Sequence, residues 1–167
     1  LRVLRRFPAA KAAAVDAYLE LVQPLEFDLL ADVPTAATPL VSSLSDRLGV
    51  GMVTPRIEAK SHGSGAKVDG LVDTDRGKVA VLVDDLVTGA DSKLEAVRIL
   101  GDCGVVVREV AVLIDREQGG KEQLAVAGLA LHAALTMLEI LDFYTKSGKL
   151  ELERYRDVVE RLWPRNT

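Results

Sequence analysis

The sequence is poor in the residues that mark several common classes of protein. Its single cysteine, Cys103, excludes an internal disulfide framework and fits a reducing compartment. Aromatic residues make up only 4% of the chain, and the formal net charge of −4 gives no bulk attraction to nucleic acid. The apolar runs are all shorter than a membrane span, and no signal peptide is visible. We therefore expect a cytoplasmic protein that binds neither nucleic acid nor membranes.

The chain is long enough and apolar enough to form one domain with a substantial core. It has 167 residues, of which 49% are hydrophobic and 28% charged, an ordinary composition for a globular domain. Neither an internal repeat nor a low-complexity linker divides it. We predict a single domain over residues 1–167.

The residues from Val79 to Leu100 carry the strongest pattern in the chain. An unbroken apolar run, Val79 to Val83, predicts a strand that is buried on both faces. Asp84 and Asp85 follow, then a loop of small residues, and then a helix that opens where Ser92 and Glu95 have the spacing of a capping box. In an open α/β sheet such a loop lies at the carboxyl end of a strand, where ligands bind. Its amides and the helix N-terminus favour a phosphate group.

The acidic pair indicates more than a phosphate site, because carboxylates repel phosphate. A sugar with both a phosphate and neighbouring hydroxyls would use both halves of the segment. The loop amides would bind the phosphate, and the carboxylates of Asp84 and Asp85 would accept hydrogen bonds from ribose hydroxyls. The alternative is a strand end with two solvated acids and an ordinary turn.

A second strand–loop–helix unit precedes the first. Residues 27–31 predict a strand, residues 32–38 a loop of small residues, and the following residues a helix that ends near Leu48 at Gly49. The loop should open on the same edge of the sheet and let the backbone approach a diphosphate closely. A plain connection between strand and helix is the alternative.

Hydrophobic periodicity predicts the remaining elements. Helices are expected over residues 9–22, 121–127, 136–144 and 150–162, and strands over 50–54, 105–114 and 129–135, the second interrupted by Arg108 and Glu109. Strands that alternate with helices predict an α/β fold with a doubly wound, mostly parallel sheet. Residues 136–167 would form a helical C-terminus.

The most polar stretch, residues 55–78, predicts a long mobile loop. It contains Arg56, Lys60 and His62 among several glycines. One interpretation is a lid that brings cations onto a polyphosphate, with His62 donating a proton or hydrogen bond. The other is the solvated tip of a β-hairpin.

Arg116 is the best candidate for binding a substrate carboxylate. It follows a predicted strand within a charged cluster that ends in two glycines, and a guanidinium binds carboxylate in a bidentate way. The alternative is an internal ion pair with Asp115 or Glu117. His132 lies in an apolar strand and is interpreted as a structural histidine.

Three of these segments together resemble the orotate phosphoribosyltransferases, a family of type I phosphoribosyltransferases. Residues 83–93 resemble the motif for phosphoribosyl diphosphate (PRPP), residues 55–63 the mobile catalytic loop, and residues 113–120 the orotate-side segment. The resemblance implies transfer of the phosphoribosyl group of PRPP to N1 of orotate with Mg²⁺. The products are diphosphate and orotidine 5′-monophosphate, an intermediate of pyrimidine synthesis. It also implies a flexible hood over residues 55–78 and a homodimer with shared active sites.

The resemblance assigns catalysis to Arg56, Lys60 and His62, which would contact the diphosphate from the neighbouring subunit of a dimer, and to Asp84 and Asp85. The two aspartates would hold the ribose hydroxyls and contact the metal through water.

The resemblance also assigns the binding residues. Thr88 and Arg116 would face orotate, and the loop of Pro34, Thr35 and Ala36 would lie near the diphosphate. The full PRPP-binding set is Arg56, Lys60, His62, Asp84, Asp85, Leu86, Val87, Thr88, Gly89, Ala90, Asp91 and Ser92.

The sequence departs from the family pattern at three places. Ile57 stands where the family usually has lysine, and Gly89, Ala90 and Asp91 replace the usual residues after Thr88. The family's N-terminal part has no counterpart before the first residue. These departures keep two alternatives open: a protein of this fold that binds PRPP or a nucleotide as a regulator, and a phosphoribosyltransferase for another base.

Overall fold

The computed structural model describes residues 1–56 and 67–164, and its centre is a six-stranded sheet with strand order β3-β2-β1-β4-β5-β6. Five strands are parallel, and β3 pairs antiparallel with β2. The strands are β1 (Leu29–Asp32), β2 (Met52–Pro55), β3 (Val68–Asp69), β4 (Val79–Val87), β5 (Val106–Asp115) and β6 (Ala130–Thr136). The mostly parallel sheet confirms the predicted fold class.

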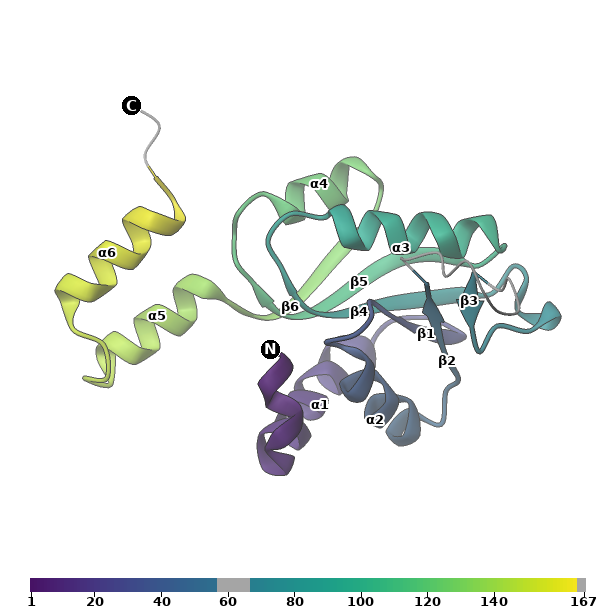
Figure 1. Cartoon of the computed structure of the whole chain (residues 1–167), viewed down its shortest axis with the longest axis horizontal. Coiled ribbons are helices and arrows are strands. Elements are labelled where there is room, and N and C mark those ends of the chain that lie inside the picture. Colours follow the sequence, from purple (N-terminus) through teal and green to yellow (C-terminus); the bar gives the residue numbers. More distant parts are fainter. Residues whose placement is uncertain (57–66, 165–167) are drawn as a thin grey trace.

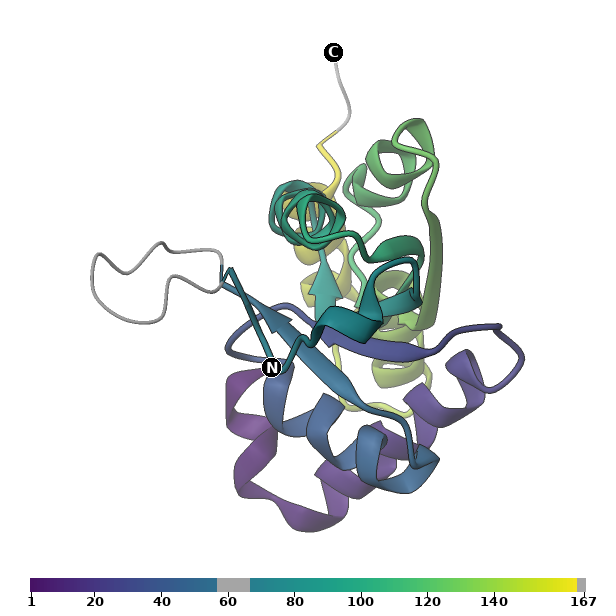
Figure 2. The same cartoon turned by 90° about the vertical axis from the view of Figure 1, so that its right-hand side faces the viewer.

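Helices cover both faces of the sheet, as a doubly wound fold requires (Figures 1 and 2). On one face lie α1 (Pro8–Val22) and α2 (Thr38–Leu48), and on the other lie α3 (Asp91–Asp102) and α4 (Gly120–Val126). The C-terminal helices α5 (Met137–Lys146) and α6 (Leu152–Leu162) extend beyond the end of β6 (Figure 1). Two short 3-10 helices, η1 (Arg2–Arg6) and η2 (Asp73–Asp75), were not expected from the sequence. Among the described residues, no helix has the length and apolar character needed to cross a membrane.

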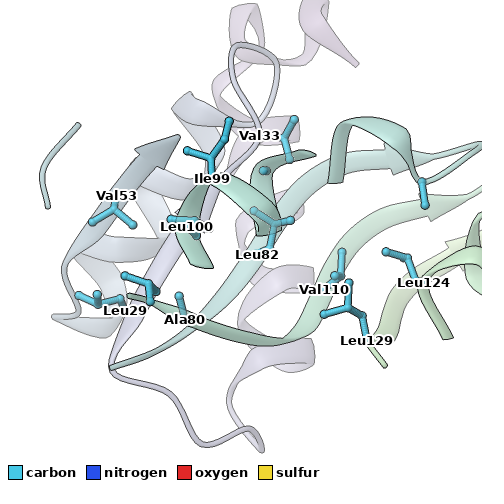
Figure 3. Packing of buried hydrophobic residues seen from close by; sticks show 14 of the residues in the cluster. Leu29, Val33, Val53, Ala80, Leu82, Ile99, Leu100, Val110, Leu124 and Leu129 are labelled. Atoms are coloured by element: carbon cyan, nitrogen blue, oxygen red, sulfur yellow. The ribbon is translucent and has the colours of Figure 1, made fainter. Parts of the chain in front are cut away.

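The core has two layers, one on each face of the sheet. Successive residues of β4 alternate between them, so that Leu82 packs with Leu100 on the α3 side and Val83 with Leu44 on the α2 side. Figure 3 shows the first layer around Leu82 and Val110. The run that begins at Val79 is therefore a strand buried on both faces, as its composition predicted.

Two predictions about the central segment are wrong in detail. The strand does not end before the acidic pair: β4 continues to Val87, because β5 offers a pairing partner as far as Val87↔Asp115. The capping box at Ser92 is absent, since α3 begins at Asp91 after Ala90 and has no side-chain cap. The carbonyl of Ala90 accepts hydrogen bonds from two amides of the first turn, which starts the helix earlier than Ser92 would.

Other boundaries shift by a residue or two, and one interruption has a structural cause. The predicted strands at 27–31 and 50–54 are β1 and β2, which begin two residues later. The charged interruption of β5 is a β-bulge: its pairing with β4 passes from Val107↔Ala80 to Glu109↔Val81, leaving Arg108 as an extra residue. Within the loop predicted over 55–78, β3 pairs with the end of β2 at Pro55↔Val68, and residues 57–66 lie outside the described part.

Candidate functional site

A cavity of about 270 Å³ lies at the carboxyl edge of the sheet, between the loops that follow β1 and β4. Chain order reverses there, because β2 lies on one side of this strand pair and β5 on the other. Such a switch point is the usual ligand site of an open α/β sheet. The cavity collects these predicted residues: Pro34, Thr35, Ala36, Asp84, Asp85, Leu86, Thr88, Gly89 and Ser92.

Asp84 is held from several directions. Its Oδ2 accepts a hydrogen bond from Lys93 Nζ at 2.5 Å, and its Oδ1 accepts one from the Asp85 amide at 2.8 Å. Its backbone carbonyl accepts the hydroxyl of Tyr18 at 2.6 Å. Lys93 also donates to the carbonyl of Leu86 at 2.7 Å. This buried network fixes the carboxylate at the end of β4.

Burial also sets the protonation states of this network. It raises the pKa of Asp84 to about 6, because desolvation outweighs the lowering by the ammonium of Lys93 and its hydrogen bond. At neutral pH the carboxylate is therefore mostly ionised. Burial, together with the charges of Asp84 and Asp85, raises the pKa of Tyr18 far above its usual range. The phenol consequently stays a neutral donor.

Asp85 lines the same cavity from the other side of the strand end. Successive side chains of a strand point to opposite faces, so the two carboxylates leave β4 in opposite directions. Asp85 Oδ2 lies 2.7 Å from the amino nitrogen of Leu1. Arg2, on η1, lines the cavity as well. The site thus combines two carboxylates with the cations of Lys93 and Arg2.

The phosphate half of the site is the turn that leads into α3. The amide of Ala90 donates to Gln123 Oε1 of α4 at 2.8 Å, so it serves the turn itself. The amides of Asp91 and Ser92, in the first turn, have no intrahelical acceptor and suit an anion. The side chain of Asp91 is exposed and does not line the cavity. The negative charge of Asp91 at the N-terminus of α3 stabilises the helix, because it interacts favourably with the helix dipole.

The loop after β1 is anchored on both sides by Asp32. This buried carboxylate accepts hydrogen bonds from the hydroxyl of Thr38 in α2 and from Thr54 Oγ1 in β2, the latter at 2.5 Å. The anchors fix both the helix that follows the loop and the neighbouring strand. Pro34, Thr35 and Ala36 are thereby presented to the cavity.

Arg56 and Arg116 do not line the cavity. Arg56 Nε donates to both carboxylate oxygens of Asp69, at 2.9 and 3.0 Å, where β2 pairs with β3. The amide of Arg116 donates to the carbonyl of Val87 at 3.0 Å, which places it beside the start of the phosphate loop. The described residues show no ion pair from Arg116 to Asp115 or Glu117, and its Nε is buried without a hydrogen-bond partner.

The other predicted residues fall outside the cavity in different ways. Val87 and Ala90 are buried in the core. Lys60 and His62, like Ile57, lie outside the described residues. His132 is paired with Glu109 across β5 and β6 at 2.7 Å, in keeping with a structural role.

The sequence analysis missed Lys93 and the polar role of Tyr18. A signal for Lys93 existed: it occupies the buried face of α3 with Ala96 and Leu100, where a charged residue requires a partner. Tyr18 lies on the buried face of α1, and only the fold brings its hydroxyl to Asp84.

The donor set suits a magnesium ion that keeps most of its water. Within residues 1–56 and 67–164, no cluster of three or more His, Cys, Asp or Glu side chains could enclose a metal. Mg²⁺ is commonly bound by one or two carboxylates together with substrate phosphates and water. Asp84 and Asp85 beside a phosphate site fit that pattern.

The class of this fold and site is set by comparison with known families. The family described as "Phosphoribosyl transferase domain" matches residues 5–129, and the chain belongs to it. Orotate phosphoribosyltransferase of Methanopyrus kandleri is 38% identical over 129 residues, which are 77% of this chain and 68% of that protein. The Caenorhabditis elegans enzyme of the same name is 31% identical over 97% of this chain and 71% of its own.

The chain is also similar to part of longer proteins and to solved structures. The chain is 34% identical to "Bifunctional enzyme PyrF/PyrE" of Nostoc sp., covering 93% of this chain but only 32% of that protein. It superimposes on Leishmania donovani UMP synthase with a TM-score of 0.86 and 30% identity, covering 96% of this chain and 34% of that one. For Aeropyrum pernix orotate phosphoribosyltransferase the TM-score is 0.76 and the identity 31%, covering 89% and 81%. Within its class, the chain is a member of the orotate phosphoribosyltransferase family.

Proposed function

We propose that this chain transfers the phosphoribosyl group of PRPP to orotate, giving orotidine 5′-monophosphate and diphosphate for pyrimidine synthesis. One observation carries the proposal: a single cavity holds the carboxylates of Asp84 and Asp85, the turn into α3 and the loop of Pro34 to Ala36. These groups suit, respectively, the ribose hydroxyls, the 5′-phosphate and the diphosphate of PRPP. Membership of the orotate phosphoribosyltransferase family supports the choice of acceptor.

The transfer places charge where this site can stabilise it. Breaking the bond between the anomeric carbon and diphosphate develops positive charge on the ribose and negative charge on the leaving group. The carboxylates of Asp84 and Asp85 would hold the sugar, and Lys93 would keep Asp84 in place. Mg²⁺, when bound through water to these carboxylates, would neutralise the diphosphate.

The acceptor would lie between Thr88 and Arg116. The Arg116 guanidinium would bind the carboxylate of orotate, and Thr88 lines the cavity beside it. The ring nitrogen of orotate forms the new bond to the anomeric carbon as diphosphate departs. The reaction therefore needs no nucleophilic side chain from the protein.

The proposal includes a homodimer in the cytoplasm. Arg56, Lys60 and His62 would reach the diphosphate of a neighbouring subunit, as the family resemblance implies. Arg56 would first have to leave Asp69, with which it is paired.

The pairing of Arg56 with Asp69 favours one alternative of a different class. A chain whose diphosphate cation is engaged elsewhere would bind PRPP or a nucleotide without turnover and act as a regulator. The two functions differ in a single measurement, the consumption of acceptor.

The test is to incubate the full chain with PRPP, Mg²⁺ and orotate and to follow orotate loss by absorbance. We expect turnover that requires all three components and is abolished in Asp85→Asn, which preserves size but removes the charge. PRPP binding without turnover would support the regulator instead. Turnover only with another base would reassign the acceptor.

A further inference from the structure

The C-terminal end of α6 is hydrogen-bonded to the segment that carries Arg116. Trp163 Nε1 donates to the carbonyl of Glu117 at 2.6 Å. Gln118 Nε2 donates in the opposite direction, to the carbonyl of Leu162 at 3.0 Å. The partners are more than 40 residues apart in sequence. The end of the chain therefore holds residues 117 and 118 by two reciprocal bonds.

The same segment is constrained at Glu117. This residue has a φ of 54°, a left-handed conformation that is uncommon outside glycine and asparagine. Its amide donates to Asp115 Oδ1 at 2.8 Å, and its Oε2 accepts the amide of Leu138, at the start of α5, at 3.2 Å. Contacts from β5, α5 and the end of α6 thus combine to maintain one backbone conformation next to Arg116.

The other side of the segment is fixed against the phosphate loop. The Arg116 amide donates to the carbonyl of Val87. Gly120 packs so closely that an added Cβ would lie 2.4 Å from Val87 Cγ2 and 2.7 Å from the carbonyl oxygen of Thr88. Arg116 itself makes the first of these attachments, and its buried Nε has no hydrogen-bond partner. A buried donor without a partner calls for an explanation, and an incoming anion would supply the missing acceptor.

We propose that Trp163 and Gln118 are positioning residues for the acceptor site, which they serve by fixing the backbone that carries Arg116. The inference rests on the proposed function, because it assumes that Arg116 binds orotate. It assigns α5 and α6 a part in acceptor binding, with no part in binding PRPP. PRPP would occupy the cavity between β1 and β4, whose lining does not include Trp163 or Gln118.

The test compares two variants of the full chain that each lose one hydrogen bond of the C-terminal helices. Trp163→Phe removes the indole donor to Glu117 and keeps an aromatic ring. Tyr155→Phe removes the bond from the Tyr155 hydroxyl to Asp142 Oδ1, 2.9 Å long, which joins α6 to α5 without touching the Arg116 segment. We expect W163F to raise KM for orotate about fivefold, the effect of one neutral hydrogen bond, and to leave KM for PRPP unchanged. Y155F should change neither value.

A second variant and a second measurement test the positioning role independently of the kinetics of W163F. Gln118→Ala removes the other bond and should reproduce the selective rise in KM for orotate. Hydrogen exchange should become faster at the amides of residues 116–119 in W163F and stay unchanged in Y155F. Unaltered exchange, or equal rises in both KM values, would overturn the positioning role. A wild-type chain that binds PRPP but never consumes orotate would instead overturn the proposed function, and the exchange result would still decide whether the segment is held.

Discussion

Lys93 is the residue on which the behaviour of the acidic pair most depends. It is only 3% exposed, and a buried ammonium is stable in its charged form only with close partners. Asp84 Oδ2 and the carbonyl of Leu86 provide them. Removing the lysine would leave Asp84 buried with less compensation for its charge, which links the pair to the pH dependence of the site.

We expect kcat/KM for PRPP to fall as the pH drops through about 6, because the Asp84 carboxylate then takes up a proton. The contribution of Asp84 to stability should change in the opposite direction. Its folded-state pKa is raised above the usual value, so the folded state binds the proton more tightly, and this contribution is lost as pH rises through about 6. A pH–rate profile measures the first effect, and unfolding at several pH values the second.

Substrate phosphates also titrate near pH 6, so the fall in kcat/KM could arise from PRPP and not from Asp84. The variant Lys93→Met distinguishes the two. Losing the ammonium should raise the pKa of Asp84 further and move the midpoint of the profile to higher pH. The titration of PRPP itself is the same for both proteins. A midpoint that does not move would show that Asp84 is not the titrating group.

Arg116→Ala should weaken orotate binding far more than PRPP binding. Loss of a charge-assisted hydrogen bond corresponds to about 1.5–3 kcal/mol, or roughly a 10- to 160-fold rise in KM for orotate. Arg98→Ala removes an exposed guanidinium that is paired with Glu95 on α3, and should change neither KM. Steady-state kinetics with each substrate varied in turn would measure the effect. Equal losses for both substrates would remove the role assigned to Arg116.

At the scale of elements, the sequence predicted the types of the main helices and strands better than their ends. Apolar runs and helical periodicity define β4 and α3, but the ends depend on partners that are distant in the chain. Pairing with β5 extends β4 through Asp84 and Asp85. The bond from Ala90 to Gln123 of α4 fixes the turn before α3, which local capping rules could not reveal.

The close contact at the start of α4 gives a prediction about stability. Gly120→Ala should destabilise the fold by about 1–3 kcal/mol, the usual effect of overpacking, because the new Cβ meets Val87 and the Thr88 backbone. Gly101→Ala is the matched change, since nothing lies within 4 Å of its added Cβ. In that helix position alanine should be neutral or stabilising by up to about 1 kcal/mol. Urea unfolding of both variants measures the difference, and equal effects would contradict the packing argument.

At the scale of the whole molecule, the sequence predicted which loops form the site, because the order of strands and helices determines it. Loops after parallel strands meet at one edge, so Pro34 to Ala36 and the turn after β4 were expected to lie together. The bond from Tyr18 to Asp84 and the bond from Trp163 to Glu117 join distant parts of the chain. Such contacts follow from how α1 and α6 pack, which no local pattern encodes.

The exposed apolar side chains of the C-terminal helices bear on the proposed homodimer. Phe143 in α5 is 63% exposed and lies against Tyr144, whose ring is also exposed. If this surface is buried between subunits, Phe143→Glu should shift the chain from dimer to monomer in sedimentation equilibrium. Val126 in α4 is 92% exposed, and Val126→Glu should leave the assembly unchanged. A wild-type protein that sediments as a single chain would contradict the dimer itself.

Trp163 has a practical consequence as well as a structural one. It is the sole tryptophan of the chain, and its indole N–H donates a hydrogen bond to the carbonyl of Glu117, next to Arg116. Intrinsic fluorescence excited selectively at tryptophan therefore comes from one known place. Its emission wavelength and its quenching by acrylamide report on the surroundings of residues 116–118, so ligand titrations there require no attached dye.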